Sequence, residues 1–241
     1  MHDVDGANAE YEDSPEVEQM RADLCAYNAL IADTFIDVPD QKLPYLEREI
    51  KSGRRQGRLA RTPLCTLDNH VKRIFNRERW DCGGRFYGGW WQGVGSEFRQ
   101  KTHINGQPTV EIDYRAIHIA MLCAQRGISL DGDPYVLNSG LIPGLDDRKQ
   151  RKLIKSLVLV ALNAVSRTAA CQAFRQNSPT GSAAKRMRDA ELFHLLDAFL
   201  IKHPYLTEDL CADRGIQLMR GDSDIAAYVI NAMTSRGIPI L

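Results

Sequence analysis

The feature that most constrains this chain is an amphipathic stretch that begins at Asp147. Its cations recur at i, i+3, i+4 and i+7, and apolar residues occupy the opposite side, which is the pattern of a helix with one buried face. Asp146 or Asp147 can cap such a helix, which we expect to run from about 147 to 174. The cations are Arg148, Arg151, Lys152 and Lys155, and the apolar positions are Leu153, Leu157, Val160, Ala161 and Ala164.

The charge of this region is one-sided, because no Asp or Glu occurs between residues 148 and 188. A solvated surface helix, the alternative interpretation, would normally intersperse glutamates with its lysines. A basic face of this length favours contact with phosphate groups. The free N–H groups at the start of the helix would add to an anion site suited to a triphosphate.

The remaining periodicities predict an α+β protein that is mostly helical. The segment 108–114 alternates as a strand does, and GIPIL at 237–241 has the composition of a buried strand. We expect these two segments to be antiparallel neighbours in one small sheet, with the 147–174 helix projecting away from it. Further helices are expected at about 14–35 with Ser14 as the N-cap, 44–60, 116–126 ended by Gly127, 183–202, 206–212, and 222–236 capped by Asp222 or Ser223.

A glycine-rich segment, DCGGRFYGGWWQGVGS, occupies residues 81–96. Its glycines and paired tryptophans predict neither an ordinary helix nor an ordinary strand. The glycines would let the backbone approach a nucleic-acid strand, with Arg85 and Tyr87 contacting phosphate and sugar. The alternative is a packed aromatic loop in which Trp90 and Trp91 belong to the core.

Two carboxylates lie near the end of the predicted strand 108–114. Glu111 and Asp113 would lie about 7 Å apart on one strand face. Mg²⁺ prefers one or two carboxylates together with waters and phosphate oxygens, so such a strand end can hold it. An acidic pair that is merely solvated on an edge strand is the alternative.

Composition limits the other classes of function. The formal net charge is zero, but residues 1–20 are acidic without any Lys or Arg, while residues 47–79 are rich in Arg. No apolar run is long enough for a membrane helix and the N-terminus has no secretory pattern, so we expect a cytoplasmic protein. The six cysteines show no zinc spacing and are expected to be reduced thiols.

The order of these elements resembles that of family A DNA polymerases. Those enzymes carry a G-R-L loop ending near a glutamine, then a D-Y strand-helix junction called motif A, then a helix with R-x-x-x-K called motif B. This sequence has Gly84-Arg85-Phe86 followed by Gln92, then Asp113-Tyr114, then Arg151-x-x-x-Lys155. Phage-type RNA polymerases of the same superfamily have a D-x-R-G-R-x-Y loop, which residues 81–87 resemble even more closely.

The resemblance covers about residues 66–241 and implies a palm sheet with helical fingers. By this resemblance Asp113, helped by the Tyr114 carbonyl, would bind catalytic Mg²⁺ or Mn²⁺. Motif C, a His-Asp dipeptide that follows a strand, would come after Leu241. The implied nucleotide-binding residues are Arg148, Arg151, Lys155, Tyr114, His118 and Asn163, and the implied nucleic-acid contacts are Arg85, Tyr87 and Gln92.

These observations predict a template-directed nucleotidyltransferase with DNA or RNA template-primer and nucleoside triphosphates as partners. Where many family A members have a tyrosine and a glutamate, this chain has Asn163 and His118, which leaves its choice of sugar open. A phage-type RNA polymerase or primase-like enzyme, an inactive nucleic-acid-binding relative and an unrelated helical protein are the alternatives. The expected division is a disordered acidic tail at 1–14, a helical region at 15–65 and the polymerase-like part at 66–241.

Overall fold

The computed structural model describes residues 1–50, 57–65 and 69–241. The described chain forms two compact units that are interleaved along the sequence. Unit 1 consists of Met1–Glu49, Leu59–Asp113 and Met219–Leu241, and unit 2 is built mainly from Tyr114–Leu218. The two units are therefore described separately.

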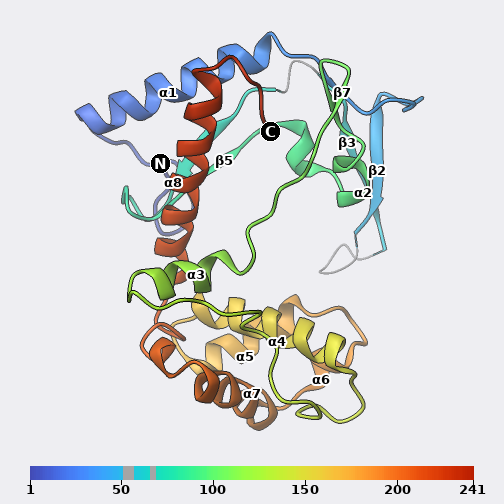
Figure 1. The fold of residues 1–241 in the computed structure, drawn as a ribbon, viewed down its shortest axis with the longest axis vertical. Helices are drawn as coiled ribbons and strands as arrows, with labels where there is room; N and C mark the ends of the chain where they lie inside the picture. The colour runs from blue at the N-terminus through green and yellow to red at the C-terminus, as the bar shows by residue number, and fades with distance from the viewer. Residues whose placement is uncertain (51–56, 66–68) are drawn as a thin grey trace. The chain divides into compact units, whose positions relative to one another are not determined.

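Unit 1 combines the helices α1, α2 and most of α8 with small antiparallel sheets (Figure 1). Ser14 caps α1 through a hydrogen bond from the N–H of Val17, as the sequence predicts. Its elements are α1 (Pro15–Ala32), β1 (Ile36–Asp37), β2 (Tyr45–Glu49), β3 (Leu59–Pro63), β4 (Lys72–Phe75), β5 (Gly83–Tyr87), the 3-10 turn η2 (Trp90–Gly93), α2 (Ser96–Arg99), β6 (His103–Ile104), β7 (Gln107–Pro108) and the greater part of α8 (Gly215–Thr234).

The core of unit 1 forms where α1 meets the glycine-rich segment. Trp90 and Trp91 are 5% and 4% exposed, and they pack with Tyr27 and Ile31 of α1. Burial of aromatic side chains of this size makes a large contribution to stability. The alternative interpretation of these two tryptophans, as core residues, is thus the correct one.

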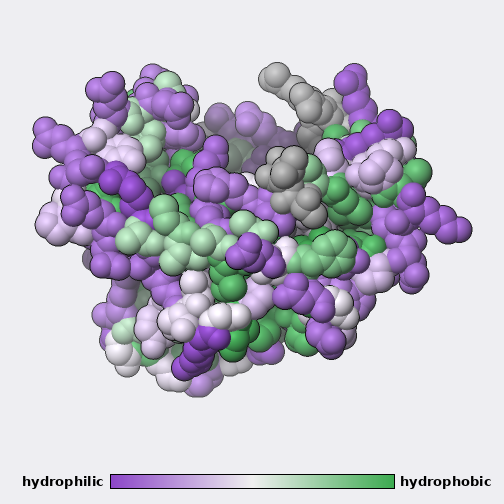
Figure 2. Space-filling view, turned by 90° about the horizontal axis from the view of Figure 1, so that it is seen from above, coloured by the Kyte–Doolittle hydropathy of each residue, from purple (hydrophilic) through white to green (hydrophobic). Residues whose placement is uncertain are grey.

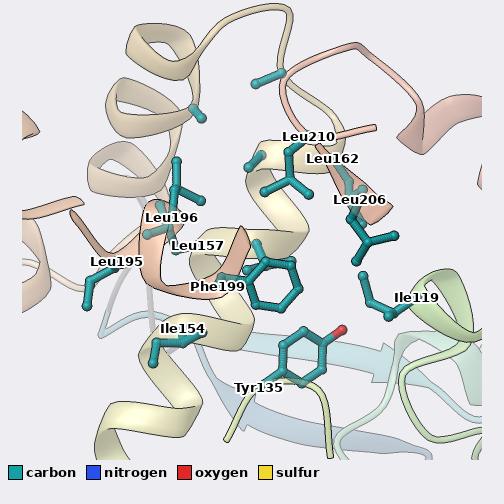
Figure 3. Close-up of a cluster of buried hydrophobic side chains, with 14 of the residues drawn as sticks. Ile119, Tyr135, Ile154, Leu157, Leu162, Leu195, Leu196, Phe199, Leu206 and Leu210 are labelled. Carbon is teal, nitrogen blue, oxygen red and sulfur yellow. The ribbon is translucent and has the colours of Figure 1, made fainter. Parts of the chain in front are cut away.

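Unit 2 is a helical bundle whose core lies between α4, α5 and α7. The 14 drawn side chains in Figure 3 include Leu157, Leu196 and Phe199, all of which are buried. Asp146 caps α4 by accepting a hydrogen bond from the N–H of Lys149, as expected. The elements are α3 (Ile117–Ala124), α4 (Asp147–Leu162), α5 (Arg167–Asn177), α6 (Ala183–Arg186), α7 (Asp189–Lys202), η3 (Pro204–Leu206) and the first turn of α8.

The predicted pairing of 108–114 with 237–241 as antiparallel strands is wrong. Only Gln107–Pro108 pairs as a strand, with β6, and residues 109–113 have no regular secondary structure. Val110 and Ile112 are 85% and 82% exposed, and GIPIL is not a strand either. Alternation of side chains sorts residues onto two faces, but a strand also needs a hydrogen-bonded neighbour. The pairing of β7 with β6 ends at Pro108, and no strand of the described chain pairs with 237–241.

The glycine-rich segment is also different from its prediction, because Gly83–Tyr87 forms a strand. β5 pairs with β4, and the pairing shifts register at a bulge between Ile74 and Phe75. Gly83 and Gly84 have φ values of 78° and 80°, which glycine adopts easily. A Cβ at Gly84 would come within 2.9 Å of Ser223 Oγ, so this glycine permits close approach of α8. The glycines therefore shape a strand rather than prevent one.

The predicted helix at 44–60 is wrong, because most of its described residues belong to the antiparallel pair β2–β3. Arg61 donates to Glu47 across this pair at 2.7 Å, and its guanidinium lies over the Tyr45 ring. Such cross-strand pairs stabilise antiparallel pairing of the two strands. Residues 51–56 of the prediction lie outside the described residues.

Several helix boundaries differ from the prediction. The 147–174 helix is two helices, because Asn163 ends α4 and Ser166 caps α5 by accepting from the N–H of Ala169. The helix at 183–202 is divided in the same way into α6 and α7, and 206–212 is a series of turns. Helix α8 begins at Gly215, so Asp222 and Ser223 lie inside it and do not cap it.

The fold class and the end of the helix before Gly127 agree with the prediction. The α+β class is correct, and Gly127 lies just beyond α3 with a φ of 66°. The acidic segment 1–14 is described, with a bridge between His2 and Asn8. No helix of the described chain is long and apolar enough to cross a membrane. The face shown in Figure 2 is largely hydrophilic, with smaller hydrophobic areas between the polar side chains.

Candidate nucleic-acid interface

The cationic surface of unit 2 is concentrated on α4 and the segment that follows it. Residues 114–218 contain 14 Lys and Arg against ten Asp and Glu, and ten of those 14 cations lie between residues 148 and 188. Within the described chain, no acidic side chain pairs with Arg148, Lys152 or Lys155 on α4. A cation without a protein partner can bind an external anion without first breaking an ion pair.

Arg151, by contrast, is engaged within the protein. Its Nε and Nη2 donate to Oδ2 of Asp133 at 2.9 and 2.7 Å, and its guanidinium lies over the Tyr135 ring. Partial burial opposes ionisation of Asp133, but the Tyr135 N–H and the Arg151 guanidinium hold the pKa of that carboxyl below its usual range. The predicted nucleotide ligand Arg151 is therefore also a structural residue.

An open groove runs beside α4, with a volume of about 350 Å³. Lys149 and Lys152 line it together with apolar side chains from α4 and Phe174 of α5. Lys149 pairs with Asp146 at 3.0 Å, whereas Lys152 has no ion pair within the described residues. The groove thus combines an apolar surface with one lysine, Lys152, that has no ion pair within the described residues.

The predicted metal ligands lie on a concave surface of unit 1. Glu111 and Asp113 line an open depression of about 650 Å³ together with Arg99 and Gln100. Glu111 accepts from Arg99 Nε at 2.9 Å, so one of the two carboxylates is already paired. Asp113 is exposed.

This donor set fits a hard cation only in part. Mg²⁺ can be held by one or two carboxylates plus waters and phosphate oxygens, and Asp113 is suited to that role. Two ions about 4 Å apart need more carboxylate oxygens than Asp113 supplies. Among the described residues, no group of three or more His, Cys, Asp or Glu side chains is arranged to hold a metal.

Arg85 and Gln92, both predicted nucleic-acid contacts, line one cavity of about 260 Å³ in unit 1. Gln92 is fixed by the backbone: its Oε1 accepts from Gly88 N at 3.1 Å and its Nε2 donates to Phe86 O at 3.2 Å. Arg85 Nη2 donates to Oδ2 of Asp222 on α8 at 2.8 Å. The cavity is therefore bordered by an arginine–carboxylate pair and otherwise largely by apolar side chains.

A second set of charges fixes α8 against the β4–β5 hairpin (Figure 1). The Arg73 side chain is only 8% exposed, and its guanidinium lies about 5 Å from the ring centroids of Phe75 and Phe86. It donates to Gly84 O at 2.8 Å and to Asp224 at 3.2 Å. Burial lowers the pKa of Arg73, and the hydrogen bond to Asp224 opposes that shift.

The other predicted site residues are distributed over both units. Tyr87 ends β5 and is 43% exposed, and Tyr114 is 55% exposed. His118 lies in α3, partly buried. Asn163 follows α4 and donates to Leu159 O at 2.8 Å.

The sequence did not reveal the partners of the two predicted arginines. Asp133 lies 18 residues before Arg151, and Asp222 lies 137 residues after Arg85. Neither spacing is a local motif. The pair between Arg220 and Asp224 at 2.7 Å has the i, i+4 spacing of a helix, but Arg220 lies before the predicted helix at 222–236.

Comparison of the chain with protein-family models, with curated proteins and with solved structures found no match.

Proposed function

We propose that this chain contains nucleotide- and nucleic-acid-binding parts of a template-directed nucleotidyltransferase of the polymerase type. The observation that carries the proposal is the set Arg148, Lys152 and Lys155 on α4, which has no acidic partner within the described chain. This set belongs to a stretch of 41 residues without Asp or Glu. The order of Arg85, Asp113 and Lys155 along the chain supports a polymerase over other phosphate-binding proteins.

Lys155, Asp113 and Arg151 would have separate roles in phosphoryl transfer. Lys155 would bind the triphosphate and neutralise charge that develops on the transferred and leaving phosphates. Asp113, with the Tyr114 carbonyl, would hold the divalent cations, which supply the two-metal chemistry of phosphoryl transfer when bound. Arg151 would assist only while sharing its guanidinium with Asp133.

The proposal is tested by binding and synthesis together. A labelled DNA primer-template is titrated with residues 1–241, and primer extension is then measured with nucleoside triphosphates and Mg²⁺ or Mn²⁺. We expect salt-sensitive binding without extension, because Asp113 alone cannot clamp two ions. Where a longer protein that contains residues 1–241 extends the primer, Asp113→Asn should abolish that synthesis. Absence of nucleic-acid binding, or extension by the Asp113→Asn protein, would contradict the proposal.

A second candidate is a nucleic-acid-binding protein without catalysis. It is favoured by two contacts: Asp133 holds Arg151, and Arg99 holds Glu111. In that case the free cations of α4 bind phosphate, and Asp113 has no catalytic role. A longer protein that contains residues 1–241 would then bind the primer-template and still make no product, with or without Asp113→Asn.

A further inference from the structure

The ion pair between Arg85 and Asp222 has an unusual position in unit 1. Its two side chains are 40% and 28% exposed, so the pair lies at the surface and borders the cavity of about 260 Å³. The single hydrogen bond joins Arg85 Nη2 to Asp222 Oδ2. Within the described chain, Nε and Nη1 of Arg85 make no hydrogen bond.

The rest of the neighbourhood holds this pair in place. Asp222 and Ser223 are consecutive residues of α8. Ser223 is buried, with 2% of its surface exposed, and its Oγ donates a hydrogen bond to Gly83 O of β5 at 3.3 Å. Arg85 is part of the same strand, two residues beyond Gly83. The hairpin and the helix therefore keep the carboxylate within reach of the guanidinium.

We propose that Asp222 is an affinity-setting residue, which competes with nucleic-acid phosphate for Arg85 and thereby weakens binding at this cavity. This inference rests on the proposed nucleic-acid binding. A phosphate that approaches Nε and Nη1 of Arg85 meets the negative charge of Asp222 a few ångströms away, and Nη2 of the guanidinium is already bonded to that carboxylate. A bound phosphate must either displace the carboxylate from Arg85 or remain beside it against charge repulsion. Either effect weakens the complex.

Asp224, a neighbouring carboxylate on α8, differs from Asp222 in the exposure of the arginine that it contacts. Asp224 lies two residues further along α8 and accepts from Arg73 and Arg220. Arg73 is buried between two aromatic rings, so its guanidinium has no open side toward a nucleic acid. Asp224 therefore fixes the structure, whereas Asp222 faces an arginine that is accessible.

The test compares Asp222→Asn with Asp224→Asn, which change the net charge equally. Binding of a labelled single-stranded DNA is measured by fluorescence anisotropy at several salt concentrations. Asp222→Asn should tighten binding by about threefold to tenfold at low salt. It should also steepen the dependence of log K on log salt by about 0.7, the value for one additional phosphate contact on a single strand. Asp224→Asn should produce neither change.

Arg85→Ala assigns the effect to the proposed partner. It should weaken binding only slightly in the parent protein, and it should remove the whole gain in the Asp222→Asn protein. An equal gain from Asp224→Asn would show a general charge effect and overturn the inference, as would unchanged or weaker binding by a folded Asp222→Asn protein. If the parent protein binds DNA and Asp222→Asn does not alter the salt dependence, only this inference fails. If neither protein binds DNA, the proposed function fails as well.

Discussion

Replacement of Lys155 by alanine separates a binding role from a structural one. Lys155 lies on α4, is partly exposed and has no ion pair within the described chain. Its removal should therefore change the free energy of unfolding by no more than about 0.5 kcal/mol. A charge-assisted hydrogen bond to a phosphate contributes about 1.5–3 kcal/mol, so nucleotide binding should weaken about tenfold to a hundredfold.

The assay is a titration of the protein with a fluorescent nucleoside triphosphate, paired with a thermal melt. Lys149→Ala is the matched control, because Lys149 has the same charge on another face of α4 and pairs with Asp146. Arg151→Ala should differ from both, since it leaves Asp133 without its partner and should lower the melting temperature as well as the affinity. A Lys155→Ala protein with an unchanged Kd, or with a loss equal to that of Lys149→Ala, would refute the assignment of Lys155 to the triphosphate.

Two further predictions concern stability. Arg73→Ala should lower the free energy of unfolding of unit 1 by about 2–3 kcal/mol, because it removes buried hydrogen bonds and contacts with two aromatic rings. The control is Arg79→Ala at an exposed position, and its thermal melt should show little change. Burial lowers the pKa of His203, whose ring contacts Pro134 O and the Tyr205 hydroxyl, so the unfolded chain takes up a proton more readily than the folded one. The contribution of His203 to stability should be complete above about pH 6.5 and should be lost as the pH falls below that value, and denaturant melts between pH 5 and 8 should show a flatter profile for His203→Asn. A steeper profile for that variant would show the opposite sign.

Local signals in the sequence predicted the features that depend on neighbouring residues. Ser14 and Asp146 both cap helices, because the side chain of a cap bonds to N–H groups two or three residues away. The α+β class is correct, although the two segments from which strands were inferred, 108–114 and 237–241, do not supply the strands of the structure beyond Pro108. The break between α4 and α5 was missed, although Ser166 has the chemistry of a cap, because the apolar spacing continues through it.

Features that depend on distant partners could not be predicted. The alternation at 108–114 is real, but a strand forms only with a neighbour, and Val110 and Ile112 remain exposed. The strand Gly83–Tyr87 was missed for the opposite reason, because its glycines suit a bulged pairing with β4. Arg85 was identified as a candidate contact, whereas its partner Asp222 could be found only from the structure.

The salt dependence of nucleic-acid binding tests the central claim most directly. Anisotropy titrations of a single-stranded DNA over a range of salt concentrations are compared for the parent protein and for a variant with Arg148, Lys152 and Lys155 all replaced by glutamine. If these three cations contact phosphates, log K should fall with log salt with a slope about 2 units steeper in the parent than in the variant. Equal slopes for the two proteins, with the variant folded, would contradict the claim that α4 presents a phosphate-binding face.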